Sequence, residues 1–397
     1  MLKWIDAPSR ARLNAKSVQS IADLRKLAKS RAHRMVFDYI DGGADDEITL
    51  QRNREAYAEF EMHYSVLSGF GPADMSTRLF GHEVSLPFFA APTAGQKMFH
   101  RDGEAAAATV CAEEGAYYCL STMATTGLDE ISELLPTQPK LLQLYLWKDR
   151  ELLRDVLQRA REAGFTGLAL TADTPWLGNR ERDAHNGFTV PADMNPRQVY
   201  HSLMAPAWTF DFLSQPPYSF ALLSDDGAPA EELVVTFNEK MSKDYSWRDA
   251  EWLLGEWNGH ASLKGVCRPE DAVKALATGF DSVWVSNHGG RQLETSPPTV
   301  TLLPAIREAV GEDAEVIVDS GVMRGTDIAK ALALGASGVG IGKAYLYGLA
   351  AGGTPGVRRA FSILKGELER AMGLLGVGSV AELRRRGPEL VRRTRAK

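Results

Sequence analysis

His288 and Arg291 lie three positions apart in the segment SVWVSNHGGRQLE, where an apolar run ends and two glycines separate them. Histidine is well suited to accept a proton near neutral pH, and the planar guanidinium of arginine matches a carboxylate. Asp173 ends another apolar run, GLALTAD, and its carboxylate could orient His288 and stabilise the protonated ring. A lone histidine is more often structural than catalytic, but the glycine pair and the arginine favour catalysis. We therefore expect proton abstraction from a substrate that carries a carboxylate.

Two glycine-rich segments near the end of the chain predict a phosphate site. DSGVMRGTD carries Arg324, and GVGIGKA carries Lys343. Backbone N–H groups freed by glycine, a helix N-terminus and a cation together bind phosphate well. The second segment is not a Walker A loop, because Ser337 replaces its first glycine and Ala344 its Ser or Thr. One such loop alone would indicate only a tight turn, whereas two loops, each with a cation, favour phosphate.

These residues follow apolar runs that predict strands. Continuous hydrophobicity is typical of strands buried on both faces, which occur in parallel sheets. Segments with helical period, at 103–115, 149–164, 268–279 and 324–335, follow four of them. Eight such units predict a TIM (β/α)8 barrel rather than an open doubly wound sheet. The eight runs are 86–94, 117–122, 140–146, 167–173, 260–266, 282–288, 315–321 and 338–344.

Polar residues gather at the C-terminal ends of these runs, where a TIM barrel places its active site. Polar groups near a barrel mouth need partners or a ligand, so their gathering indicates a binding site. The residues at these ends are Pro92, Thr93, Ala94, Ser121, Thr122, Gln143, Tyr145, Thr171, Asp173, Lys264, Ser286, His288, Arg291, Asp319, Ser320, Gly321, Gly342 and Lys343.

The segments outside the repeat complete the predicted organisation. Residues 1–85 form an N-terminal extension with helical stretches around 17–40 and 46–59. Residues 86–385 form the barrel, and residues 386–397 form a C-terminal tail. An insertion of about 180–246 follows the fourth strand. Its aromatic residues are expected to pack onto the barrel, and prolines among them argue against a regular amphipathic helix there. These aromatic residues are Trp208, Phe210, Phe212 and Tyr218.

Composition restricts the class of protein. A net charge of −6 over 397 residues argues against a nucleic-acid binder, which needs a basic surface. Three cysteines without a Cys-x-x-Cys pair argue against a disulfide scaffold or a metal site. No signal peptide and no run of 18 apolar residues is present in the sequence, which predicts a cytoplasmic protein.

Several motifs, taken together, resemble the FMN-dependent L-2-hydroxy-acid oxidase/dehydrogenase family. They are FDYIDGGADDEITLQRN, APTAGQKMFH, QLYLWKDR, LTADTPWLGNRERD, SNHGGRQLE, DSGVMRGTDIAKALALGA and GIGKAYLYGLAAGG, in family order from about Ser17 to about residue 385. The resemblance implies FMN as cofactor, a small 2-hydroxy acid as substrate, and oxygen, a quinone or a cytochrome as electron acceptor. It also implies a homotetramer.

The resemblance implies roles for matching residues. His288 would take a proton from the α-carbon or hydroxyl of the substrate, Asp173 would pair with it, and Lys264 would stabilise negative charge on the reduced flavin. Tyr145 would contact the substrate hydroxyl. Tyr39, Arg180 and Arg291 would hold the substrate carboxylate. The flavin ring would contact Thr93, Ala94, Ser121, Gln143, Thr171 and Ser286. The phosphate group would contact the loops 319–324 and 342–343.

Four positions bear on how far the resemblance extends. Met323 and Lys343 stand where the family commonly has arginines near the phosphate, and Arg324 is expected to compensate. Met123 stands where glycolate oxidase has a tryptophan in the substrate pocket, which leaves substrate size open. Ala94 matches the oxidases rather than several quinone-linked members.

Three alternatives stay open at this point. An FMN monooxygenase or a cofactor-maturation oxidoreductase would use the same barrel, and a non-redox barrel could bind a phosphorylated ligand. The insertion could also attach the protein to the inner face of a membrane, although scattered acidic residues weaken that interpretation. These acidic residues are Asp211, Asp225 and Asp226.

Overall fold

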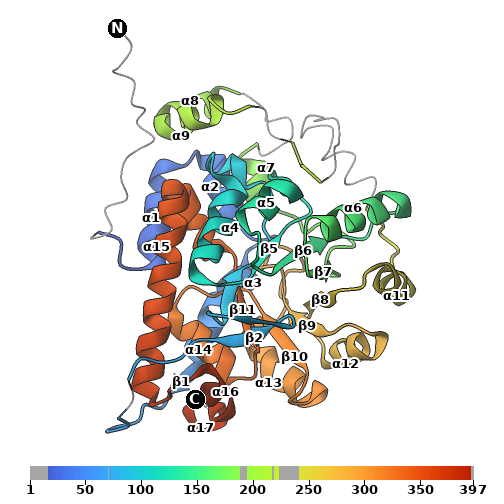
Figure 1. Ribbon diagram of the computed structural model, residues 1–397. Helices are drawn as coiled ribbons and strands as arrows, with labels where there is room; N and C mark the ends of the chain where they lie inside the picture. The colour runs from blue at the N-terminus through green and yellow to red at the C-terminus, as the bar shows by residue number, and fades with distance from the viewer. Residues whose placement is uncertain (1–16, 70, 188–194, 217–218, 223–240, 395–397) are drawn as a thin grey trace.

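The computed structural model describes residues 17–69, 71–187, 195–216, 219–222 and 241–394. Eight parallel strands form a closed barrel in the order β10-β11-β4-β5-β6-β7-β8-β9 (Figure 1). Each predicted apolar run contains one of these strands, which confirms the TIM barrel. The strands are β4 Phe88–Ala90, β5 Tyr118–Leu120, β6 Lys140–Leu144, β7 Gly167–Thr171, β8 His260–Val266, β9 Ser282–Val285, β10 Glu315–Val318 and β11 Gly338–Ile341.

Helices surround the barrel, and the four predicted segments of helical period all form helices. Their ends follow local signals: Asp149 caps the first turn of α6, and Gly115 and Gly279 end α4 and α12 in the left-handed conformation. The helices are α4 Gly103–Glu114, α5 Leu128–Leu134, α6 Arg150–Glu162, α11 Trp247–Glu256, α12 Pro269–Thr278, α13 Thr299–Val310, α14 Gly325–Ala333 and α15 Lys343–Leu375.

A hairpin that the sequence did not reveal closes the N-terminal end of the barrel. Strands β2 (Thr77–Leu79) and β3 (His82–Val84) are joined by Phe80 and Gly81, both at positive φ, which is typical of a type I′ turn. The Phe80 ring is fully buried and lies edge-on to rings from β4 and β8. The barrel interior is therefore filled at this end, and the strands open toward a site only at the other.

The N-terminal extension lies along the barrel and meets the other end of the chain. Helix α1 packs against α15 (Figure 1). Strand β1 (Phe60–Met62) pairs antiparallel with β12 (Val391–Arg393), so part of the predicted C-terminal tail is a strand joined to the extension. The remaining elements of these two regions are α1 Ile21–Arg31, α2 Arg34–Asp41, α3 Ile48–Glu55, η2 Ala56–Glu59, α16 Val380–Arg385 and α17 Gly387–Leu390.

The expectation against a helix among the prolines of the insertion was wrong for residues 206–213, where a short helix forms. Helices α8 (Pro196–Met204) and α9 (Pro206–Leu213) lie beside each other outside the barrel (Figure 1). Each begins with proline in its first turn, where the missing N–H costs nothing and the fixed φ suits a helix. These prolines therefore start the helices rather than prevent them.

The side chains of α9 divide between the barrel and the surface. Trp208 donates a hydrogen bond from Nε1 to the Met98 carbonyl at 2.9 Å, which confirms the predicted packing, but Phe210 is exposed. Asp211 is buried in an ion pair with Arg101, so it does not add a surface acidic charge. Tyr218, Asp225 and Asp226 lie outside the described residues. Among the described helices, none is long and apolar enough to cross a bilayer.

Candidate active site

A cavity of about 590 Å³ opens at the C-terminal ends of the barrel strands. Most of the residues predicted from the strand ends line it. Asp173 and Ser286 lie behind the lining, bonded to His288 and Lys264. The predicted residues in the lining are Tyr39, Pro92, Thr93, Ala94, Ser121, Gln143, Tyr145, Thr171, Arg180, Lys264, His288, Arg291, Asp319, Ser320, Gly321, Gly342 and Lys343.

His288 and Asp173 form a hydrogen-bonded pair at this cavity. Nδ1 of His288 lies 3.2 Å from Oδ1 of Asp173. Because an ionised carboxylate can only accept, Nδ1 carries the hydrogen and Nε2 is left as the proton acceptor. Burial lowers the pKa of His288, and Asp173 partly opposes this. The lowered pKa favours the neutral ring, in which Nε2 can accept a proton.

The glycines after His288 have a conformational reason. His288, Gly289 and Gly290 are all at positive φ, a conformation that histidine tolerates better than most residues and glycine adopts freely. A Cβ on Gly290 would lie 2.5 Å from the backbone nitrogen of Leu50, so the loop also presses against α3. The two glycines therefore turn the chain sharply enough to present His288 and Arg291 to the same cavity.

Arg291 and Arg180 place positive charge beside His288. Nη1 of Arg291 donates to the carbonyls of Tyr39 and Gly42 at 2.7 and 3.2 Å, while its Nη2 is buried without a hydrogen-bond partner among the described residues. Nε of Arg180 is also buried and unpaired there. Buried N–H groups of this kind need an acceptor, and a carboxylate in the cavity would provide one.

Lys264 is held as a cation in the lining of the site. It donates to Ser286 Oγ at 3.0 Å and lies 3.3 Å from Asp319 Oδ2. Burial opposes its charge, but Asp319 and Asp173 outweigh that effect and raise the pKa of Lys264. This geometry suits a fixed positive charge at the edge of a bound ring.

Neutral polar side chains cover the adjoining wall. Gln143 donates to Thr171 Oγ1 at 2.9 Å and accepts from Ser121 Oγ at 3.2 Å. Thr93 Oγ1 lies 2.6 Å from the hydroxyl of Tyr345. Burial, and then Asp173, raise the pKa of Tyr145, so its hydroxyl stays protonated and can donate a hydrogen bond. Such a wall offers donors and acceptors to a heteroaromatic ring.

The far end of the cavity fits a phosphate group. Helix α15 begins here, and its first N–H groups have no partner within the helix. A Cβ on Gly342 would meet no atom within 4 Å, so the backbone borders open space. A phosphorylated ligand that extends from the polar wall to this helix end therefore fits the residues present.

Arg324 lies apart from this cavity, which corrects its predicted role. Its guanidinium pairs with Glu367 of α15 at 2.9 Å, and the side chain is 53% exposed. The preceding residue, Met323, lines the cavity. Arg324 itself is not among the lining residues, because its side chain turns toward Glu367.

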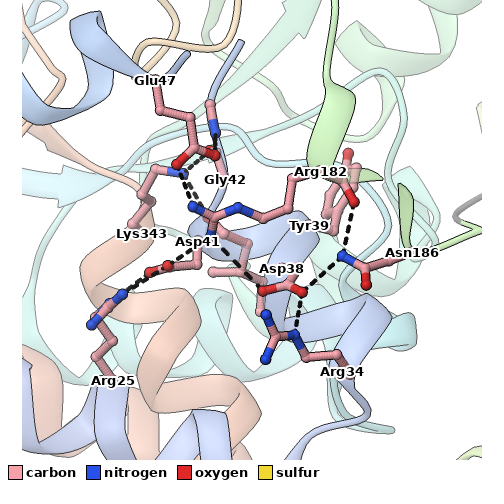
Figure 2. A network of polar contacts seen from close by, with 12 residues as sticks. Arg25, Arg34, Asp38, Tyr39, Asp41, Gly42, Glu47, Arg182, Asn186 and Lys343 are labelled. Carbon is pink, nitrogen blue, oxygen red and sulfur yellow. Dashed lines mark hydrogen bonds and ion pairs between the residues drawn. The ribbon is translucent and has the colours of Figure 1, made fainter. Parts of the chain in front are cut away.

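Lys343 lines the cavity but is bonded to the end of α2. Its Nζ donates to the carbonyls of Ile40 and Gly42 at 2.6 and 2.8 Å, as Figure 2 shows for Gly42. Carbonyls at a helix C-terminus lack partners and attract cations. Burial first, and then Arg291 and Arg54, lower the pKa of Lys343 well below its ordinary value.

Ion pairs fix the end of α2 in turn (Figure 2). Asp41 accepts hydrogen bonds from Arg25 at 2.6 and 2.8 Å and from Arg182 at 3.0 Å. Glu47 pairs with the same Arg182. The helix that holds Arg291 is thus anchored by charged residues on several segments.

Some side chains of the lining were missed by the sequence reasoning. Phe220 and Met241 belong to the insertion, where their types indicated packing but not its place. Met98 lies in a short 3-10 turn. Arg54 lies on α3 among charged and polar residues, and no local pattern distinguishes it.

Comparisons with known proteins agree with this geometry. A family model described as FMN-dependent dehydrogenase matches residues 28–390. An L-lactate dehydrogenase of Caulobacter vibrioides (strain NA1000 / CB15N) is 39% identical over 370 residues, 92% of this chain and 96% of the relative.

Solved structures are similar over almost the whole chain. The monotopic membrane protein (S)-mandelate dehydrogenase matches with a TM-score of 0.90 and 30% identity, covering 95% of this chain and 99% of that one. A mandelate oxidase matches with a TM-score of 0.78 and 32% identity, covering 93% and 98%. The protein belongs to the FMN-dependent dehydrogenase family, and its cofactor is FMN.

Proposed function

We propose that the protein oxidises a small L-2-hydroxy acid to the 2-oxo acid. The observation that carries this proposal is the His288–Asp173 pair beside Arg291 and Arg180 in one cavity. In each guanidinium a buried N–H lacks a hydrogen-bond acceptor among the described residues, which the substrate carboxylate would supply, and Nε2 of His288 accepts the proton. Lactate and mandelate, the acids named for the related dehydrogenases, are both substrates of this class.

The side chains divide the remaining work. Asp173 stabilises the protonated form of His288, and Tyr145 donates to the substrate oxygen. Lys264 would hold positive charge at the edge of the flavin ring. Bound FMN supplies the two-electron acceptor that these side chains lack.

Anaerobic mixing with a panel of 2-hydroxy acids tests the proposal. The flavin absorbance should bleach with at least one L-acid and not with its D-enantiomer. Product analysis then separates 2-oxo acid formation from the decarboxylated product of a monooxygenase. A holoenzyme that bleaches with no 2-hydroxy acid would contradict the proposal, and oxygen or a quinone analogue added afterwards identifies the acceptor.

We also propose that α8 and α9 attach the protein to a membrane surface. Six large apolar side chains are exposed on these two short helices, an uneven distribution for a free surface. The six exposed residues are Val199, Tyr200, Leu203, Met204, Phe210 and Leu213. The related (S)-mandelate dehydrogenase is described as monotopic. The homotetramer remains a separate prediction, which light scattering of the purified holoenzyme tests.

A further inference from the structure

Arg54 reaches the phosphate end of the cavity from the N-terminal extension. It lines the cavity together with Gly321, Met323 and Gly342. Helix α3 lies tightly on the seventh-strand loop here: a Cβ on Gly321 would lie 2.1 Å from the carbonyl oxygen of Asn53. The residue next to Asn53 is therefore fixed beside the loop that borders the phosphate position.

The other cations of this region are committed elsewhere. Arg324 is turned outward to Glu367, and Lys343 donates to two carbonyls of α2. Met323 brings no charge to the loop. At this end of the cavity Lys343 keeps one N–H beyond the two that it donates to carbonyls, whereas Arg54 has a buried guanidinium N–H with no acceptor among the described residues.

The hydrogen bonds of Arg54 leave part of its guanidinium unpaired. Nη2 lies 3.2 Å from the Tyr347 hydroxyl and 3.8 Å from Oδ1 of Asp41, which hold the group from one side. Nε is buried and has no partner among the described residues. A buried N–H without an acceptor is costly, and a phosphate oxygen would satisfy it with a charge-assisted hydrogen bond.

We propose that Arg54 binds the phosphate group of FMN and so takes the role that the sequence assigned to Arg324. Asp41 and Tyr347 orient its guanidinium, while Lys343 fixes α2 beside it. The inference depends on the cofactor of the family and not on the identity of the substrate. It therefore stands or falls separately from the proposed oxidation of a 2-hydroxy acid.

Flavin binding to the apoenzyme tests the proposal without any turnover. Riboflavin has the ring and the ribityl chain of FMN but no phosphate, so it separates a phosphate contact from general loosening of the site. Dissociation constants for both flavins are measured by quenching of flavin fluorescence. Arg54→Gln should weaken FMN binding about 10- to 100-fold, the range for a lost hydrogen bond to a charged group, and leave riboflavin binding unchanged.

Two further variants sharpen the test. Arg324→Gln is the matched control and should bind FMN like the wild type. Met323→Arg in the Arg54→Gln background should recover most of the lost FMN affinity, because it returns a guanidinium to the same end of the cavity. Equal losses for FMN and riboflavin in Arg54→Gln, or a larger FMN loss in Arg324→Gln, would overturn the proposal.

Discussion

His288 is subject to two opposing electrostatic effects at the residue scale. Burial favours the neutral ring, which can accept a proton, whereas Asp173 favours the protonated ring that results. Lys264 and Arg180 add to the effect of burial, since both carry positive charge. The pKa of His288 is lowered on balance, so the base is already deprotonated at neutral pH, and Asp173 limits the cost of protonating it.

Replacement of His288 tests whether this residue acts in flavin reduction rather than in FMN binding. His288→Ala should retain FMN, because the ring and phosphate contacts lie on other residues. Flavin reduction by substrate should slow by at least about 100-fold, since general base catalysis typically contributes that much or more. Anaerobic stopped-flow absorbance measures both quantities, and reduction at a near-normal rate would remove His288 from the mechanism.

The role of Asp173 has a signature in the pH dependence. The rate of flavin reduction should rise with pH through the pKa of His288, because only the neutral ring accepts a proton. Asp173 raises this pKa, so Asp173→Asn should move the rise to lower pH. The maximal rate should fall by roughly 100- to 10,000-fold. A merely structural carboxylate would change the rate without moving the profile.

The outcome for two arginines shows what sequence cannot resolve at this scale. Arg324 follows a glycine-rich loop, and the motif locates the loop correctly. Whether a side chain of that loop faces the cavity or α15 depends on backbone angles that composition does not reveal. Arg54 comes from a helix more than 250 residues earlier in the chain, so only the tertiary contact between α3 and the loop exposes it.

At the scale of elements, the C-terminal end of α2 connects the extension with the site. Its carbonyls hold Arg291 and Lys343, and Asp41 ties the same helix to Arg25 and Arg182 (Figure 2). Burial would raise the pKa of Asp41, but the hydrogen bonds from Arg25 and Tyr347 outweigh it and lower the pKa far below its ordinary value.

Loss of this carboxylate should destabilise the fold. Asp41→Asn should lower the free energy of unfolding by about 1–3 kcal/mol, a range reduced because both arginines are partly exposed. Since the folded-state pKa is lowered, the contribution is complete above the ordinary aspartate pKa and is lost as pH falls toward the folded value. Denaturant titrations at several pH values measure it.

An exposed ion pair provides the control for Asp41. Glu113 and Arg358 are each more than 40% exposed, so Glu113→Gln should lower the free energy of unfolding by less than about 1 kcal/mol. The buried network would not stabilise α2 if Asp41→Asn lowered the free energy of unfolding no more than Glu113→Gln does. The same conclusion would follow if the decrease in Asp41→Asn did not depend on pH in the acid range.

The contact between α3 and the catalytic loop can be tested through glycine. Gly290 and Gly69 have nearly the same φ, +74° and +72°, but only Gly290 has atoms within 4 Å of an added Cβ. Gly69→Ala should lower the free energy of unfolding by about 1–2 kcal/mol, because alanine is strained at this positive φ. Gly290→Ala should cost about 1–3 kcal/mol more from overlap with Leu50, and should also slow flavin reduction. Thermal unfolding measures the stability of both variants, and equal destabilisation by Gly69→Ala and Gly290→Ala would contradict tight packing at this contact.

The elements that sequence predicted share one property. All eight barrel strands are continuous apolar runs followed by polar residues, and burial on both faces produces that pattern. The strands of the β2–β3 hairpin and of the β1–β12 pair each mix charged and apolar residues, so no continuous apolar run marks them. Helices α8 and α9 were missed because their prolines were interpreted as breakers, although proline in the first turn favours a helix.

At the scale of the whole molecule, the exposed residues of α8 and α9 lie on one outlying part of the structure (Figure 1). The wild-type holoenzyme should co-sediment with liposomes of anionic phospholipid. Leu203→Glu combined with Leu213→Glu should release it into the supernatant, because two charges would enter the apolar layer. Flavin reduction by substrate should be unchanged in this variant.

Leu374→Glu is the matched control for membrane binding. Leu374 is 61% exposed but lies near the end of α15, far along the chain from α8 and α9. This variant should still co-sediment. Wild-type protein that stays in the supernatant, or equal release by both sets of substitutions, would contradict attachment through α8 and α9.

The pairing of β1 with β12 sets the order in which the protein can be completed during synthesis. The extension leaves the ribosome before the barrel, but its strand partner is separated from it by about 330 residues and is made after the last barrel strand. At typical rates of elongation, of roughly 5–20 residues per second, the extension waits tens of seconds for this partner. Every residue that lines the cavity is made before β12, whereas the extension that carries Tyr39 and Arg54 lacks this strand pair until β12 is made. A chain interrupted before β12 would therefore have all the residues of the site, with an extension held by fewer contacts.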